Sequence, residues 1–456
     1  MRFTLLGKVS VFVVIFMATC ASVATSATSL SPAERVQGGT TEEKVTFDQY
    51  VRRCAVPTKT IDLFLSGPTW ARFDSELGYI QQTYVRHDAI DSSSSINTFS
   101  ADGTRTSFLY ANRKPRINTY GDSFTSGEQV NDGETWQEYL AAHLGEPIRN
   151  YGIGGYGLYQ SYRRMIREET TGQGAEYLIL YIWGDDATRS LLRARYCAFY
   201  PWFETGSPIE RARRFHGNFW PHVEMNLQTG QFVEKENPLP TPQALYRMTD
   251  PRWMAGNLKD DLALQLAAFS RGSTSGLDRK RIAQLAARLD FDLDQSGWND
   301  PASSARLREQ AAALLNRYAQ RANQFVLDKA RSFARDHGKK LMIVLFDPYG
   351  TMKQLAEGRP RDDQETLDYL RREKIDFFDM NEEHVRDFRK YNLSWDDYLQ
   401  QYFIGHYNPR GNHFFAYALK DKMVDWLDPK PITYSNASSD SVDFTGYLNG
   451  YRSATR

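Results

Sequence analysis

The sequence predicts an α/β protein with a three-layer core, in which a parallel β-sheet is covered by helices on both faces. Two observations carry this prediction. Between residues 115 and 190, short apolar segments alternate with amphipathic helical segments, and the same alternation resumes at residue 340. Strands that alternate with helices in this way form parallel sheets, because each helix crosses over one face of the sheet. The segment at about 190–335 breaks the pattern, and we expect a helical insertion that roofs the carboxyl edge of the sheet.

The strands and helices of the core are predicted from their apolar patterns. Predicted strands lie at 116–120, 147–151, 177–183, 340–346 and 374–380, and predicted helices lie at 133–144, 158–169 and 414–427. The run at 177–183 is apolar or aromatic at every position, as expected for a strand buried on both faces. In the segment 133–144, Trp136, Leu140 and Leu144 recur on one helical face.

Residues 28–114 precede this core and have a different character. Their first part is polar, and alternating stretches at 96–100 and 104–109 are typical of strands joined by turns. We expect a polar lead-in followed by a small β-rich subdomain that packs on the core. The core domain then spans 115–430, and a polar tail follows at 431–456.

The first 27 residues have the features of a secretory signal peptide. Arg2 and Lys8 precede an apolar stretch at 9–23, and the small residues at 24–27 resemble a cleavage site. The apolar stretch is shorter than the roughly 20 residues that a membrane-spanning helix needs. We therefore expect a secreted or periplasmic protein, with an uncleaved membrane anchor as the alternative and no other contact with a membrane.

Export would leave two cysteines in the mature chain, Cys54 and Cys197. In an oxidising compartment these two could form one disulfide. Two separate buried thiols are the alternative, and the spacing resembles no metal site.

The composition narrows the class of partner. Basic and acidic residues number 56 each, so the net charge is zero, and no long basic run supplies the face that a nucleic acid would need. The 41% hydrophobic and 25% charged content is that of a folded globular protein. A small molecule or a polysaccharide remains the expected partner, and no nucleic acid is expected.

Ser123 stands in the tripeptide Gly121-Asp122-Ser123, directly after the first predicted strand of the core. The carboxyl end of a parallel strand is where α/β proteins bind their ligands. Gly121 permits a tight turn, and the free N–H groups at the start of the following helix can face an anion. Taken alone, the tripeptide could equally be a turn that caps a helix.

Three further blocks follow in order along the core. The segment NYGIGGYG at 150–157 follows the second strand, WGDD at 183–186 ends the third, and HYNPRGN at 406–412 precedes the last helix. Together with the serine tripeptide, these segments resemble the four conserved blocks of the SGNH (GDSL) hydrolases, a family of serine esterases with a flavodoxin-like core. The resemblance covers about residues 115–190 and 340–428.

The resemblance implies a role for each matching residue. Ser123 would attack the acyl carbon, and His406 would be the general base that takes and later returns the proton. The backbone N–H groups of Ser123 and Gly155 would stabilise the oxyanion. His413 is a competing candidate for the base, but it lies at the start of the last helix, whereas the family's histidine precedes the N-P-x-G turn.

Two positions depart from the family pattern. Asp185 stands where the family has an asparagine that donates to the oxyanion, and a carboxylate cannot donate unless it is protonated. Either Asp185 is held neutral by burial, or it turns away, or the site does not stabilise an ester oxyanion.

The second departure concerns the acid that orients the histidine. The family usually has an aspartate three residues before it, and that position is Phe403. The remaining candidates are a backbone carbonyl and the carboxylates of Asp347, Asp396 and Asp397.

The predicted reaction is hydrolysis of an ester through an acyl-enzyme on Ser123, without a metal or a cofactor. Family analogy favours a carbohydrate ester such as an O-acetyl group, and transfer of the acyl group to a sugar would use the same site. A second hypothesis is a catalytically degenerate carbohydrate-binding protein, with Asp185 as the sign of decay. In the insertion, His216, Trp220 and His222 either line a sugar subsite or pack in a loop over the site.

A third hypothesis rests on the glycine spacing of the second block. Gly152, Gly154 and Gly157 match the G-x-G-x-x-G fingerprint of dinucleotide-binding proteins. Here, however, the motif follows the second strand rather than the first, and an exported protein would rarely meet NAD.

Overall fold

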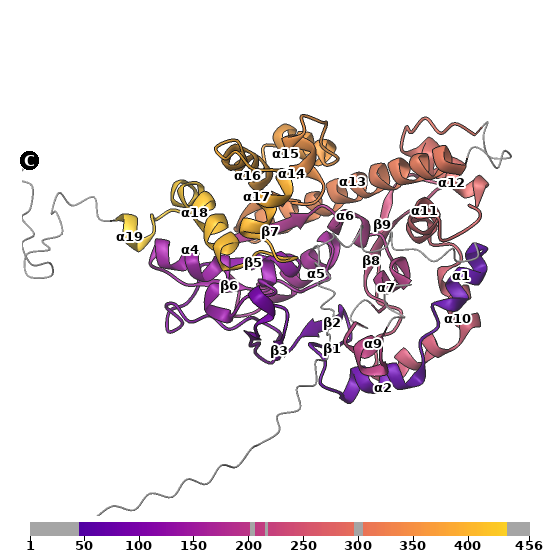
Figure 1. Ribbon diagram of the computed structural model, residues 1–456, viewed down its shortest axis with the longest axis horizontal. Coiled ribbons are helices and arrows are strands. Elements are labelled where there is room, and N and C mark those ends of the chain that lie inside the picture. Colours follow the sequence, from indigo (N-terminus) through magenta and orange to yellow (C-terminus); the bar gives the residue numbers. More distant parts are fainter. Residues whose placement is uncertain (1–44, 201–205, 215–217, 296–303, 436–456) are drawn as a thin grey trace, which may run out of the picture.

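The computed structural model describes residues 45–200, 206–214, 218–295 and 304–435 (Figure 1). The predicted signal peptide, His216 and the tail from residue 436 lie outside these residues. No helix in the described ranges combines the length and the apolar content needed to cross a bilayer.

A five-stranded parallel sheet forms the centre of the protein, which confirms the predicted α/β class. Its strands are β5 (Ile117–Tyr120), β6 (Ile148–Asn150), β7 (Tyr177–Trp183), β10 (Lys340–Phe346) and β11 (Asp376–Asp379). The order across the sheet is β6-β5-β7-β10-β11, so that the strands lie in the chain order 2-1-3-4-5. This is the doubly wound order found in flavodoxin, and it reverses direction between β5 and β7.

Helices cover both faces of the sheet. One face packs on α4 (Trp136–Leu144), α16 (Met380–Phe388) and α18 (Pro409–Trp426), and the other on α5 (Leu158–Glu169), α13 (Ser304–Asp336) and α15 (Gln364–Arg372). Alternate residues of β7 enter the two cores, with Leu178 and Leu180 on the side of α5 and Ile179 and Tyr181 on the side of α4. The seven residues of β7 are all buried, which explains their continuous apolar pattern.

The N-terminal region is less β-rich than predicted. It contains α1 (Phe47–Arg53) and α2 (Thr58–Ser66), followed by the hairpin of β1 (Ala71–Asp74) and β2 (Gly78–Gln81) and the pair of β3 (Tyr84–Arg86) and β4 (Ser95–Asn97). A capping box of Thr46 and Gln49 starts α1, a local signal that the prediction overlooked. The strand expected at 104–109 is absent, and only isolated bridges of Arg105 remain there.

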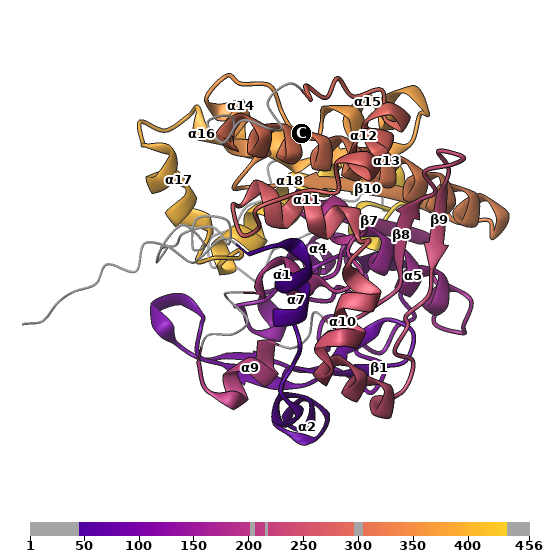
Figure 2. The same ribbon diagram turned by 90° about the vertical axis from the view of Figure 1, so that its right-hand side faces the viewer.

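The insertion packs against the N-terminal region and shares its core. Its elements are α7 (Arg195–Ala198), α9 (Pro208–Arg214), β8 (His222–Met225), β9 (Phe232–Lys235), the 3-10 helix η3 (Pro242–Thr249), α10 (Pro251–Leu258), α11 (Leu262–Ser270) and α12 (Arg279–Arg288). Helix α1 contacts α10, and α2 contacts α9 (Figure 2). The long helix α13, predicted as part of the insertion, packs on α11 of the insertion and also on α5 and β10 of the core.

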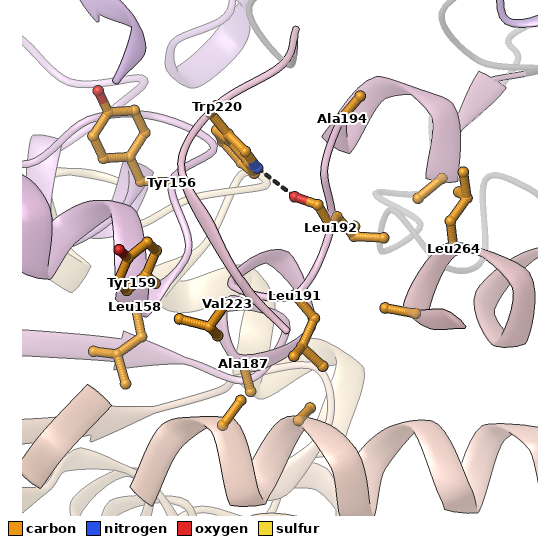
Figure 3. Close-up of a cluster of buried hydrophobic side chains, with 14 of the residues drawn as sticks. Tyr156, Leu158, Tyr159, Ala187, Leu191, Leu192, Ala194, Trp220, Val223 and Leu264 are labelled. Atoms are coloured by element: carbon orange, nitrogen blue, oxygen red, sulfur yellow. Dashed lines mark hydrogen bonds between the residues drawn. The ribbon is translucent and has the colours of Figure 1, made fainter. Parts of the chain in front are cut away.

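Residues of the insertion cover the carboxyl ends of β6 and β7. Figure 3 shows Tyr156, which follows β6, and Ala187, which follows β7, in one cluster with Trp220, Val223 and Leu264. Trp220 is fully buried, and its Nε1 donates to the carbonyl of Leu192 at 2.6 Å. His222 is also buried and lies 2.9 Å from Glu224. The prediction of a sugar subsite is therefore wrong for Trp220 and His222, because both rings are buried and neither can stack on a sugar.

Cys54 and Cys197 are both buried, and no disulfide joins them. Hydrogen bonds link the segment around Cys54 to the segment around Cys197. The hydroxyl of Tyr50 donates to the carbonyl of Cys197, and that of Tyr196 donates to the carbonyl of Cys54. The segment that carries Cys54 and the segment that carries Cys197 are therefore held side by side.

The remaining elements are short helices. They are η1 (Ile90–Ser92), α3 (Ser123–Ser126), η2 (Asp132–Glu134), α6 (Asp186–Arg189), α14 (Thr351–Ala356), α17 (Trp395–Tyr402) and α19 (Ile432–Ser435).

Candidate active site

Ser123 begins the short helix α3 immediately after β5. This is the edge of the sheet where the strand order reverses, which is the usual ligand position in doubly wound proteins. The carboxylate of Asp122 caps the helix by accepting from the Phe124 N–H at 2.9 Å. Gly121 is required here because a Cβ would lie 2.2 Å from Thr125 Oγ1. The turn therefore presents the serine hydroxyl at the carboxyl edge of the sheet.

The structure brings Ser123 and His406 together. His406 Nε2 lies 2.7 Å from Ser123 Oγ, although the residues are 283 positions apart in the chain. The histidine stands in the loop before α18, whose N-cap Asn408 accepts from the Gly411 N–H at 2.9 Å. His413 lies elsewhere, on α18, with its ring 5.3 Å from that of Tyr139. The geometry therefore pairs the serine with His406 and not with His413.

Gln129 holds the other side of the His406 ring. Its Oε1 accepts from the His406 backbone N–H at 2.7 Å and lies 3.1 Å from Nδ1, while its Nε2 donates to the Asp88 carbonyl at 2.7 Å. An amide oxygen can only accept, so His406 Nδ1 must carry the proton. The Nε2 lone pair is then directed at the serine hydroxyl. Gln129 lies six residues beyond Ser123, and only that proximity hinted at its role.

The carboxylates considered from the sequence do not bond to His406. Asp347 accepts from the N–H groups of Tyr349, Gly350 and Thr351 and so closes the turn after β10, where burial raises the pKa of its carboxyl to about 6. Asp396 and Asp397 lie exposed in the first turn of α17. The described group that lies against His406 Nδ1 is an amide oxygen from the loop that follows the nucleophile.

The glycine-rich turn at 153–156 supplies a candidate oxyanion donor. The Tyr156 N–H donates to the Ile153 carbonyl at 3.2 Å, and Gly155 at the third position has a φ of 86°, as a type II turn requires. The Ile153 N–H donates to the Gly121 carbonyl at 3.0 Å, which ties the turn to the nucleophile. Among the described residues, no acceptor takes the backbone N–H of Gly155 or that of Ser123.

Packing explains the glycines that resemble a dinucleotide fingerprint. A Cβ on Gly152 would lie 2.2 Å from the Ser126 backbone N, and one on Gly157 would lie 2.6 Å from the Asp186 carbonyl oxygen. A Cβ on Gly154 would lie 1.8 Å from a carboxylate oxygen of Glu128. The space beside each glycine is filled by protein, and a carboxylate there would repel a pyrophosphate. The turn therefore does not fit a dinucleotide.

Asp185 is directed at a cation. Its carboxylate lies 3.0 Å from Arg189 Nε, one turn further along α6, and is 29% exposed. Burial therefore does not hold Asp185 neutral, and its carboxylate does not donate to Ser123. Of the three possibilities raised by the sequence, the structure shows the second, in which Asp185 turns away, here toward Arg189. Two oxyanion donors from the predicted set remain, both of them backbone N–H groups.

Beneath the nucleophile, two buried carboxyls share Arg189. Asp186 Oδ1 lies 3.0 Å from Arg189 Nη1, and Asp122 Oδ2 lies 3.9 Å from the same nitrogen. Burial raises the pKa of Asp122 to about 6, against the opposing charge of Arg189. Burial together with the Asp122 charge also raises the pKa of Asp186. Both carboxyls thus bind a proton more tightly in the folded protein than in the unfolded chain.

This arrangement predicts a loss of stability as the pH rises. A carboxyl whose pKa is raised by folding stabilises the protein fully at a pH below its pKa in the unfolded chain. This contribution is lost as the pH rises through its pKa in the folded protein. For Asp122 that window runs from about pH 4 to pH 6, and the loss is roughly 2–3 kcal/mol. Asp122→Asn keeps the acceptor for the Phe124 N–H and should reduce the change in the free energy of unfolding between pH 4 and pH 6. Urea unfolding at a series of pH values checks the prediction, and an unchanged slope in the variant would contradict it.

A scan against protein-family models and a search of the curated proteins found no match for this sequence. The function of the site therefore has to be inferred from its own geometry and from the four sequence blocks.

Proposed function

We propose that this protein is an exported serine ester hydrolase of the SGNH type, with Ser123 as nucleophile and His406 as general base. The observation that carries the proposal is the chain of contacts from Ser123 Oγ through the His406 ring to Gln129 Oε1, at 2.7 and 3.1 Å. A nucleophile, a base and a group that orients the base are the three parts of a hydrolytic triad. These three side chains lie at the edge of the sheet where doubly wound proteins bind their ligands.

The proposed reaction follows from this geometry. Ser123 Oγ attacks the acyl carbon while its proton passes to His406 Nε2, and the electron pair of the carbonyl moves onto its oxygen. The backbone N–H groups of Ser123 and Gly155 stabilise that oxyanion. The tetrahedral intermediate collapses as the imidazolium protonates the leaving alcohol, which leaves an acyl-serine. Water, deprotonated by the same histidine, then releases the acid and restores Ser123.

The proposed substrate is a carbohydrate ester, on family analogy and the expected export of the chain. Transfer of the acyl group to a sugar hydroxyl would differ only in the nucleophile of the second step. The formed contact between Ser123 and His406 is the reason we favour an enzyme over a carbohydrate-binding protein without activity.

A fluorophosphonate probe tests the proposal directly. The purified protein should form a covalent adduct at Ser123, located by mass spectrometry of its peptides, because only an activated serine reacts with such a probe. His406→Ala should abolish labelling, since the base is lost, whereas His413→Ala should label as the unaltered protein does. A folded protein that neither labels nor turns over 4-nitrophenyl acetate, yet binds polysaccharide, would instead support the inactive binding protein.

A further inference from the structure

His406 stands in the loop at 403–408, between the end of α17 and the start of α18, so its position depends on how that loop is held. Within the loop, the Ile404 N–H donates to the His406 carbonyl at 2.9 Å. The side chain of Tyr407, directly after His406, reaches from the loop into the core. Tyr407 is therefore placed to carry the influence of buried residues to the general base.

The Tyr407 ring is buried among aromatic side chains. Its centroid lies 5.0 Å from that of Phe346, at the end of β10. Gly411 on α18 leaves room for the ring, since a Cβ there would lie 2.2 Å from Tyr407 Cδ1. The ring of Phe124, which follows the nucleophile, lies 5.9 Å from the Tyr407 ring and 4.9 Å from that of His406. Tyr407 thus packs the loop of the base against the residue next to the nucleophile.

The Tyr407 hydroxyl meets His384, a fully buried residue of α16. His384 Nε2 lies 2.6 Å from that hydroxyl, and His384 Nδ1 lies 2.9 Å from the hydroxyl of Tyr398 on α17. The Tyr398 hydroxyl also lies 3.0 Å from the His384 carbonyl and 3.2 Å from a carboxylate oxygen of Asp387, so its proton goes to one of these two acceptors. A buried polar chain therefore runs from Asp387 through Tyr398 and His384 to Tyr407, and it joins α16 and α17 to the loop of the base.

The direction of these hydrogen bonds places the proton of the His384 ring. Because the Tyr398 hydroxyl gives its own proton away, it accepts from Nδ1–H. His384 Nε2 is then an acceptor, and the Tyr407 hydroxyl donates to it. The opposite tautomer would leave the Tyr407 proton without an acceptor among the described residues. Burial lowers the pKa of His384 to about 3, so the ring stays neutral and keeps this acceptor at neutral pH.

We propose that His384 is a positioning residue for the general base: by accepting from the Tyr407 hydroxyl it fixes the loop at 403–408 and so holds His406 Nε2 against Ser123 Oγ. The inference rests on the proposed function of Ser123 and His406. Proton transfer needs the short separation of these two atoms, and a misplacement of about 1 Å can cost roughly 100-fold in rate. His384 acts through Tyr407 and takes no part in the proton transfer itself.

Tyr407→Phe tests the contact, since it keeps the ring and removes only the hydroxyl. The rate of labelling by the fluorophosphonate and kcat for 4-nitrophenyl acetate should both fall by roughly 10- to 100-fold. KM should stay within about twofold of its original value, because the contact positions the base and not the substrate. Tyr318→Phe is the matched control. Tyr318 is a buried tyrosine of α13 whose hydroxyl accepts from the Met225 N–H at 2.9 Å, so its loss should lower the free energy of unfolding but leave both rates unchanged.

Variants of His384 test the other side of the contact. His384→Leu removes both ring nitrogens and should slow labelling at least as much as Tyr407→Phe does. His384→Gln should restore part of the rate, because its amide oxygen can accept from the Tyr407 hydroxyl. In the double variant of Tyr407→Phe and His384→Leu the two losses should not add, because both substitutions remove the same contact. If His384→Leu yields no folded protein, Tyr407→Phe and its control decide the question alone.

Amide hydrogen exchange follows the loop without any turnover. The Ile404 N–H should exchange faster in Tyr407→Phe than in the unaltered protein, because the loop opens locally, and at an unchanged rate in Tyr318→Phe. A folded Tyr407→Phe protein with unchanged exchange, or one that labels no more slowly than Tyr318→Phe, would overturn the role of His384. Faster exchange of the loop, in a protein whose unaltered form does not label at Ser123, would overturn the proposed function alone.

Discussion

Replacing Ser123 by alanine is expected to reduce the turnover of 4-nitrophenyl acetate by about 10⁴-fold or more, because the residue that forms the acyl-enzyme is removed. The fold should be unaffected. Within the described residues the Ser123 hydroxyl forms one hydrogen bond, to His406, and alanine fits wherever a serine side chain does. Residual hydrolysis would come from the backbone donors and from binding alone.

A matched serine variant separates this effect from general damage. Ser161 on α5 is also buried, and its hydroxyl bonds to no group of the described protein. Ser161→Ala should therefore keep full activity and full stability. Turnover that survives in purified Ser123→Ala at the level of Ser161→Ala would rule out the proposed nucleophile.

The second large effect is on stability and concerns Arg105. This guanidinium is almost wholly buried, pairs with Asp132 at 3.0 Å, and donates to three backbone carbonyls of the loop after the nucleophile. Arg105→Met keeps much of the volume but leaves the buried Asp132 carboxylate without its counter-charge and removes three donors from the backbone carbonyls of the loop. Removing one partner of a buried ion pair typically costs about 3–5 kcal/mol, so we expect a loss of that size in the free energy of unfolding.

Urea unfolding measures this loss, and Arg52→Met provides the control. Arg52 pairs with Asp48 on the surface, where both side chains are about half exposed and such pairs contribute little. Labelling of the surviving folded Arg105→Met protein by the fluorophosphonate should also slow, because the loop supports Gln129. A loss of less than about 1 kcal/mol would show that the loop does not depend on Arg105.

Part of the site could be predicted because its signals are local. The tripeptide at Ser123 follows a recognisable strand, and the histidine precedes a capped helix that starts with Asn408 and Pro409. What the sequence could not show was the group that orients the ring. Gln129 and His406 are 277 positions apart, and a glutamine in a polar loop has no pattern of its own. Asp185 was similarly ambiguous until Arg189 was seen to pair with it.

The sequence by itself determined the central strands and the class of the fold. Strands β7 and β10 and helix α5 lie where their apolar patterns predicted them. The apolar residues that bury a strand or one face of a helix all belong to one short segment, so they can be recognised without knowing the rest of the fold. Only the tertiary structure decided the rest. It packed α13 on the sheet as well as on α11 of the insertion, buried Trp220, and placed Gln129 against His406. The physical reason is the same in each case: a side chain's partner depends on which distant segments pack together, and spacing along the chain does not contain that information.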